Sequence, residues 1–136
     1  MIEKIDHLGI AVRSIEEARG FYESLGLTIE HIEEVPQEKV RVAMIRVGES
    51  HIELLEPTAD DSPIAKFLDG RGPGIHHLCL RSDDVEADDA RLRAAGSRLL
   101  RDEPTRGVGG SRVQFVHPKS AGGVLLELAQ PAEGGE

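Results

Sequence analysis

The feature that most constrains the fold of this chain is a weak internal repeat, in which the second half follows the first at a shift of 70 residues. The segment 5–12 (Ile-Asp-His-Leu-Gly-Ile-Ala-Val) resembles the segment 75–80 (Ile-His-His-Leu-Cys-Leu), with His7 aligned on His77. Both segments have the alternation of a strand that is buried on one face. Because similarity at a fixed shift is the mark of a repeated supersecondary unit, we expect two similar modules.

A helix signal follows each of these strands at the same shift. Ser14 and Glu17 form a capping box, and Asp84 is a second favourable N-cap. Gly26 and Gly96 predict the ends of the two helices, because glycine is favoured just past a helix C-terminus. A strand, a cap and a stop that repeat together indicate a duplication.

The remainder of each half predicts three further strands. They are expected at 27–34, 40–47 and 51–55 in the first half and at 97–101, 112–117 and 124–129 in the second. A short connecting helix is expected at 60–68. We therefore predict a mixed α+β fold of two paired βαβββ modules. The whole chain, 1–136, is interpreted as one domain, with module 1 at about 3–57, a connector at 58–73 and module 2 at about 74–130.

Strand alternation places two histidines and two glutamates away from the apolar faces that pack on the helices. A carboxylate within an apolar strand is costly unless it is paired or bound to a metal. Two imidazoles and two carboxylates suit Co²⁺, Mn²⁺, Ni²⁺, Fe²⁺ or Zn²⁺ and leave positions open for a chelating substrate. The sequence thus favours a divalent metal site, although each residue alone is more often an ordinary hydrogen-bonded or rim residue. The four residues are His7, Glu53, His77 and Glu127.

Composition and charge exclude several classes of function. The 25 acidic and 16 basic side chains give a net charge of −9, which argues against nonspecific binding to nucleic acid. No apolar run approaches the roughly 18 residues of a membrane helix, so no membrane partner is expected. The single cysteine, Cys79, cannot form an intramolecular disulfide. Because the first residues lack a signal peptide, we expect a cytoplasmic location.

The chain resembles the vicinal oxygen chelate superfamily, and within it the methylmalonyl-CoA epimerases. The similarity extends over about residues 3–130 and is carried by the segments 5–12, 52–57, 61–68, 74–78, 117–119 and 122–128. The His-Pro-Lys segment that leads to Gly-Gly-Val-Leu-Leu-Glu-Leu is typical of the epimerases, whereas the His-Leu-Gly-Ile-Ala strand occurs across the superfamily.

This resemblance implies that the strands curl into a partly open barrel around a divalent ion, most often Co²⁺. By match, the ligands are His7, Glu53, His77 and Glu127. The substrate implied is methylmalonyl-CoA, whose (R) and (S) forms are interconverted by deprotonation at C2, a metal-stabilised enolate and reprotonation on the opposite face. A homodimer and a place in propionate metabolism are also implied.

The resemblance assigns the acid and base roles only in part. Some of these epimerases carry a further glutamate where this chain has Val42, and a glutamine where it has Glu53. Our hypothesis is that Glu53 takes the missing role and acts together with Glu127. Arg112 and Lys119 are candidates for binding the coenzyme A phosphates, beside a glycine-rich backbone that a ligand can approach closely. The alternative is that this glycine-rich segment is simply a solvated loop that binds no ligand.

Other functions remain open from the sequence. A glyoxalase I-like lyase uses similar ligands and also moves a proton beside a carbonyl. A metal-free binding protein of the same superfamily, or an interaction domain whose glutamates pair with Arg or Lys, would not need the four ligands. Metal analysis and a direct assay separate these alternatives.

Overall fold

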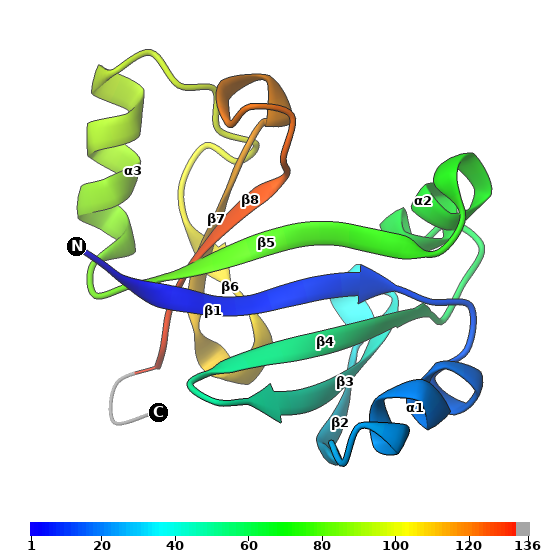
Figure 1. Ribbon diagram of the computed structural model, residues 1–136. Helices are drawn as coiled ribbons and strands as arrows, with labels where there is room; N and C mark the ends of the chain where they lie inside the picture. The colour runs from blue at the N-terminus through cyan, green and yellow to red at the C-terminus, as the bar shows by residue number, and fades with distance from the viewer. Residues whose placement is uncertain (133–136) are drawn as a thin grey trace. The chain divides into compact units, whose positions relative to one another are not determined.

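The computed structural model describes residues 1–132, so the last four residues of the predicted domain lie outside this description. The described residues form eight strands and three α-helices, with short 3₁₀ turns between them (Figure 1). Their order is β1 (Ile2–Ala11), α1 (Ile15–Ser24), β2 (Ile29–Val35), β3 (Val40–Val47), β4 (Ser50–Pro57), α2 (Pro63–Arg71), β5 (Gly74–Ser82), α3 (Val85–Ala94), β6 (Thr105–Arg106), β7 (Arg112–Val116) and β8 (Leu126–Gln130).

The chain divides into two compact units. Unit 1 comprises Met1–Asp6 and His77–Glu136, and unit 2 comprises His7–His76. The strand order is β2-β3-β4-β1 in unit 2 and β5-β8-β7-β6 in unit 1. Each half of the sequence therefore has the element order β-α-β-β-β, and the predicted α+β class with two βαβββ modules is confirmed. The domain and module boundaries stay predictions.

Corresponding strands pair in the same register in the two modules. In each module the first strand pairs in parallel with the last, as β1 with β4 and β5 with β8. Gly9 lies opposite Glu53 in the first pair, and Cys79 lies opposite Glu127 in the second. Because Cys79 is the repeat of Gly9, the two glutamates occupy equivalent positions although they do not share the 70-residue shift.

The helix caps form as the sequence predicts. The hydroxyl of Ser14 accepts a hydrogen bond from the backbone N–H of Glu17 at 3.3 Å, and the Asp84 carboxylate accepts one from Ala87 at 3.1 Å. Gly26 and Gly96 follow the helix ends with φ of +85° and +87°, a region that strains residues with a side chain. The connecting helix α2 begins later than expected, at Pro63, because Ser62 is its cap.

Replacing Asp84 by Ala is expected to lower the free energy of unfolding by about 1 kcal/mol, because it removes the acceptor for an N-terminal N–H of α3. Urea denaturation followed by circular dichroism measures the change. Asp84→Asn keeps an acceptor and should stay close to the wild type. Equal stability of D84A and the wild type would show that this cap contributes nothing.

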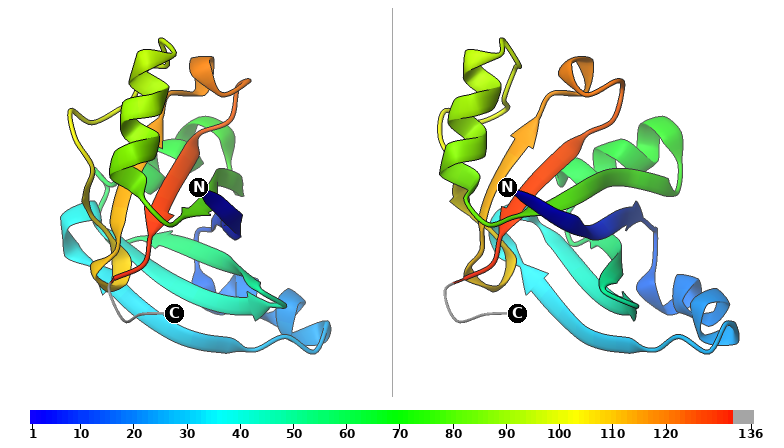
Figure 2. Two further views of the ribbon diagram at one scale, coloured as in Figure 1. Left: turned by 90° about the vertical axis from the view of Figure 1, so that its left-hand side faces the viewer. Right: turned by 60° about the vertical axis from the view of Figure 1, so that its left-hand side comes forward.

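The helix-facing sides of the strands also agree with the predicted alternation. In unit 2 the buried core consists of Val12, Ile15, Ala43, Ile45 and Leu54, and partly buried residues of α1 pack against it. In unit 1, α3 packs against β7 and β8, as both views in Figure 2 show. The histidines and glutamates of interest project from the other face of these strands. None of the helices within residues 1–132 is long and apolar enough to cross a membrane.

The strand predicted at 97–101 is wrong. The structure has only an isolated bridge between Leu99 and Val116 there, and the short strand β6 comes later in the chain. Side-chain oxygens accept hydrogen bonds from backbone N–H groups that a longer strand ladder would use. The backbone N–H of Arg98 donates to the Ser120 hydroxyl, and that of Phe115 donates to the side-chain oxygen of Gln114, each at 2.9 Å. The segment therefore follows β7 without becoming a regular strand.

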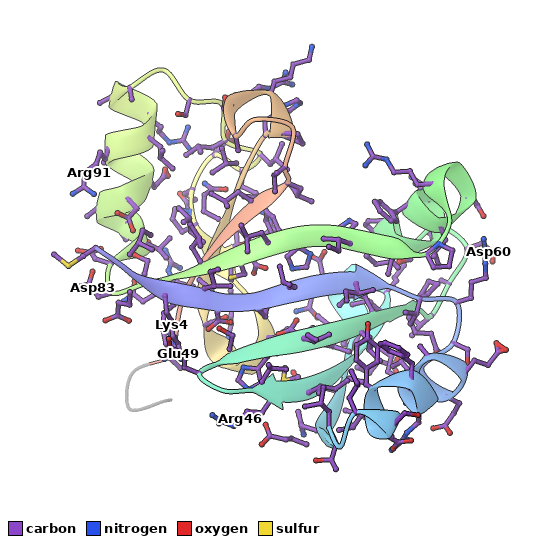
Figure 3. All side chains as sticks on the ribbon, viewed as in Figure 1. Lys4, Arg46, Glu49, Asp60, Asp83 and Arg91 are labelled. Carbon is purple, nitrogen blue, oxygen red and sulfur yellow. The ribbon has the colours of Figure 1, made fainter. Side chains whose placement is uncertain are left out.

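The start of β1 is tied to the turn before α3. The N-terminal ammonium of Met1 donates to the Asp83 carboxylate at 2.5 Å, and the Asp83 backbone N–H donates to the Met1 carbonyl at 3.1 Å. Asp83 is labelled in Figure 3. Hydrogen bonding to the carboxylate raises the pKa of the Met1 ammonium, and the same contact lowers the pKa of Asp83. Both groups are therefore charged at neutral pH.

Candidate active site

The first module brings one histidine and one glutamate together. His7 lies on β1 and Glu53 on β4, and the His7 Nδ1 is 3.3 Å from the Glu53 Oε2. The exposed fractions of the two side chains are only 7% and 11%. His7 stands two residues before Gly9, the strand partner of Glu53, so the alternation of β1 puts the imidazole on the same face as the carboxylate.

The second module repeats this arrangement. His77 lies on β5 and Glu127 on β8, and the His77 Nε2 is 3.1 Å from the Glu127 Oε1. The side chains are 8% and 12% exposed. His77 stands two residues before Cys79, the strand partner of Glu127. The structure thus joins each predicted histidine to the predicted glutamate of its own module.

The donor set of these pairs fits a divalent transition metal. A nearly buried carboxylate needs a charge partner or a cation, and a neutral imidazole nitrogen beside it is a common metal ligand. His77 and Glu127 offer ligand atoms close enough to one another to hold an ion. His7 and Glu53 offer the same two atom types at a similar separation.

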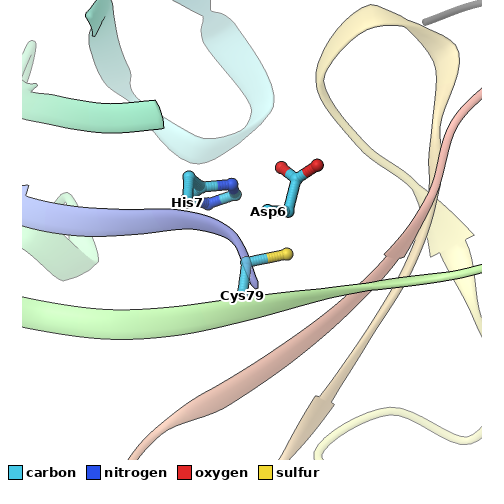
Figure 4. A group of neighbouring side chains, drawn as sticks. All are labelled: Asp6, His7 and Cys79. Carbon is cyan, nitrogen blue, oxygen red and sulfur yellow. The ribbon is translucent and has the colours of Figure 1, made fainter. Parts of the chain in front are cut away.

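Asp6 of β1 and Cys79 of β5 are two further polar side chains of unit 1 (Figure 4). A carboxylate oxygen of Asp6 and the Cys79 sulfur lie within 4.8 Å of one another, and Asp6 also accepts a hydrogen bond from Arg81 Nε at 3.3 Å. Cys79 is fully buried and lies opposite Glu127, which puts the thiol on the face of that carboxylate.

Val42 lies on the same face of its sheet as Glu53. It is opposite Leu55, two residues beyond Glu53, and only 2% of it is exposed. Met44 lies directly opposite Glu53. Valine and methionine cannot carry a proton, so neither of these two residues beside Glu53 can act as an acid or a base.

The structure places Arg112, one of the two predicted phosphate-binding residues, on the face of unit 1 away from Glu127. The Arg112 guanidinium pairs with Glu86 of α3. In β7, Arg112 alternates with Phe115, the partner of Glu127, so its side chain lies on the helix-covered face. Lys119 lies in the turn Pro118–Ser120, where its backbone N–H donates to His117 Nδ1 at 3.0 Å. Their roles stay predictions.

Phe115 and Arg101 are two residues that the sequence did not single out. Phe115 lies opposite Glu127, and its ring centroid is 6.2 Å from that of His77, edge to face. The Arg101 guanidinium lies over the Phe115 ring, 4.9 Å from its centroid. No sequence signal identified this pair, because it depends on the lateral register of β7 and on the irregular path of the segment before β6.

Comparison with known proteins agrees with this fold. Residues 6–115 match the Glyoxalase/Bleomycin resistance protein/Dioxygenase superfamily, and the chain belongs to it. An ethylmalonyl-CoA/methylmalonyl-CoA epimerase of Cereibacter sphaeroides is 40% identical over 96% of this chain and 99% of its own length.

Two solved structures extend the comparison. A variant of Streptomyces coelicolor methylmalonyl-CoA epimerase in complex with 2-nitronate-propionyl-CoA is 41% identical, with a TM-score of 0.92 over 97% of this chain and 99% of that one. A methylmalonyl-CoA epimerase in complex with methylmalonyl-CoA and NH₄⁺ is also 41% identical, with a TM-score of 0.92 over 97% and 96%. The resemblance to the epimerases is thus confirmed, and the chain is an enzyme of the epimerase class.

Proposed function

We propose that this chain interconverts (R)- and (S)-methylmalonyl-CoA by removing the proton at C2 from one face and returning a proton to the other. The observation that supports this most directly is the pair of nearly buried His–Glu contacts at equivalent registers of the two modules. The relatives named above act on, or are bound to, thioesters of this class.

We further propose that His7, Glu53, His77 and Glu127 together hold one divalent cation, with Co²⁺ expected and Mn²⁺, Ni²⁺, Fe²⁺ or Zn²⁺ as alternatives. When bound, such a cation supplies a Lewis acid that stabilises negative charge on the thioester oxygen. The burial of both carboxylates supports this proposal, because cation binding would offset their cost of desolvation.

Inversion at C2 needs two proton carriers, one for each face. We assign these roles to Glu127 and Glu53. Their equivalent positions in the two modules support the assignment, as does the presence of valine at position 42. In this arrangement one carboxylate removes the C2 proton and the other, in its acid form, donates a proton to the opposite face.

Exchange of the C2 proton of methylmalonyl-CoA with D₂O tests the proposed function. Protein reconstituted with Co²⁺ should show exchange and epimerisation, whereas protein depleted of metal should be at least about 100-fold slower, because loss of a Lewis acid costs several kcal/mol of charge stabilisation. Thermal melting of both samples checks that depletion leaves the protein folded. Absence of exchange with every metal would reject the proposal.

The same samples separate the other candidate functions. Turnover of a glutathione hemithioacetal in place of methylmalonyl-CoA would indicate a lyase of the glyoxalase I kind. Tight binding of an acyl-CoA by metal-free protein without exchange would indicate a binding protein. The homodimer, the cytoplasmic location and the role in propionate metabolism are part of the same proposal, and sedimentation analysis tests the first of them.

A further inference from the structure

We propose that Glu56 and Gln130 are positioning residues, which hold the histidine strand and the glutamate strand of each module in the register that the His–Glu contacts require. Glu56 lies on β4, three residues after Glu53. Gln130 lies on β8, three residues after Glu127. What this inference says about a bound cation rests on the proposed metal site, whereas what it says about the strand register does not.

Each of these two side chains accepts a hydrogen bond from the first residue of the helix in its own module. The backbone N–H of Ile15, where α1 begins, donates to the Glu56 Oε1 at 2.7 Å. The backbone N–H of Val85, where α3 begins, donates to the Gln130 Oε1 at 2.9 Å. The N-cap side chain of each helix accepts from an N–H two residues later, so the first N–H takes its acceptor from the last strand of the module.

These two hydrogen bonds act on a register that no hairpin fixes. In each module the strand with the histidine pairs in parallel with the strand with the glutamate, and a helix and two further strands separate them along the chain. A slip of one residue would turn every side chain of the moving strand to the other face. A tie between the end of the glutamate strand and the helix that follows the histidine strand opposes such a slip.

The tie in the first module continues the ladder between β1 and β4. After the last ladder pair, the Val12 N–H donates to the Leu55 carbonyl at 2.9 Å. Three residues later, the Ile15 N–H reaches the side chain of Glu56. Both strands end on the side of the molecule where α1 begins (Figure 1). Glu56 therefore joins the end of β4 to the chain that has just left β1.

The contact needs an acceptor oxygen of the right reach and does not need a charge. Glu56 lies opposite Arg41 of β3, whose guanidinium is 3.9 Å from the second carboxylate oxygen. Gln130 occupies the equivalent position opposite Arg112 of β7, and it makes the same contact with a neutral amide. Because the two modules form one contact with differently charged side chains, an amide at position 56 should also serve.

Titration of metal-free protein with Co²⁺, together with the visible absorption spectrum of the bound ion, tests the proposal. Glu56→Leu is expected to weaken Co²⁺ binding by about 10-fold or more, the loss typical of changes in groups that orient metal ligands, and to change the spectrum at saturation. Glu56→Gln retains the acceptor and should bind within about 3-fold of the wild type. Gln130→Leu and Gln130→Glu should show the same contrast in unit 1.

Ser14→Ala is the matched control, because it removes another acceptor at the start of α1 and leaves β4 unchanged. It should lower the stability of the protein without weakening Co²⁺ binding or changing the spectrum. A loss of affinity in S14A equal to that in E56L would show that both residues act only through the stability of the helix, and it would overturn the proposal. Unchanged affinity and spectrum in E56L would overturn it as well.

Amide hydrogen exchange of the metal-free protein tests the register without the cation. Glu56→Leu should speed exchange of the N–H groups of residues 10–12 and 54–55 by about 10-fold, and Ser14→Ala by less than about 3-fold, because only the first change loosens the pairing of β1 with β4. If the wild type binds no Co²⁺, the proposed metal site fails and this measurement alone decides the register role; unchanged exchange in E56L then rejects it. Should a leucine variant fail to fold, Glu56→Asp or Gln130→Asn takes its place, since each shortens the acceptor by one methylene.

Discussion

Replacement of Glu127 by Gln is expected to slow exchange of the C2 proton by about 10³-fold or more, which makes it one of the two most damaging single changes that we predict. A positioned acid or base contributes about 10² to 10⁴ in rate, and glutamine can neither accept nor donate the proton in this way. The change also replaces the anionic oxygen of a proposed ligand beside His77 with a neutral one, which should weaken binding of the proposed cation.

Two measurements separate these effects. Deuterium incorporation into methylmalonyl-CoA gives the rate, and metal analysis after dialysis gives the bound cation. Glu16→Gln, an exposed carboxylate of α1 that pairs with Arg19, is the matched control and should behave as the wild type. A Glu127 variant that exchanges within about 3-fold of the wild type would exclude Glu127 as a proton carrier.

Replacement of Glu53 by Gln is expected to affect the two isomers differently. The isomer whose proton faces Glu53 should lose exchange by about 10²-fold to 10⁴-fold, because its base is gone. The other isomer should still exchange through Glu127, with its configuration retained. Epimerisation should be lost in both directions, since inversion needs both carriers. Separate incubation of the (R) and (S) forms in D₂O, followed by chiral analysis, measures each rate.

A second variant strengthens the test of Glu53. Val42 lies on the same sheet face as Glu53, so a glutamate at position 42 would place a carboxylate close to the missing one. The double variant Glu53→Gln, Val42→Glu is expected to recover part of the epimerisation. Undiminished exchange from both isomers in E53Q alone would remove Glu53 from the mechanism.

The repeated elements and the paired histidines and glutamates could be predicted from sequence because they depend on local patterns. Alternation along a strand decides which side chains share a face, and a cap or a glycine decides where a helix begins or ends. Glu53 and Glu127 stand out for the same reason, as charges within apolar strands. The common shift of 70 residues relates one half of the chain to the other from sequence alone.

The features that could not be predicted depend on lateral register and on side chains that replace backbone hydrogen bonds. Segment 97–101 has the composition of a strand, but the Ser120 side chain accepts a hydrogen bond from the Arg98 N–H within it, and the Gln114 side chain accepts one from the Phe115 N–H of β7. The sequence pattern does not indicate on which face of β7 Arg112 lies, because this strand buries residues on both faces, Val113 and Gln114 among them. The contact between Arg101 and Phe115 depends both on the lateral register of β7 and on the irregular path of the segment before β6.

The strand pairing described above also links binding to folding. In each module the histidine comes from the first strand and the glutamate from the last, so neither pair exists until the intervening helix and strands are in place. The proposed ligand pairs are absent from the unfolded chain, and a cation that bound them would add its binding free energy to the stability of the native state. Nascent or partly folded chains would therefore bind the ion poorly, and cellular metal supply would favour completed molecules over folding intermediates.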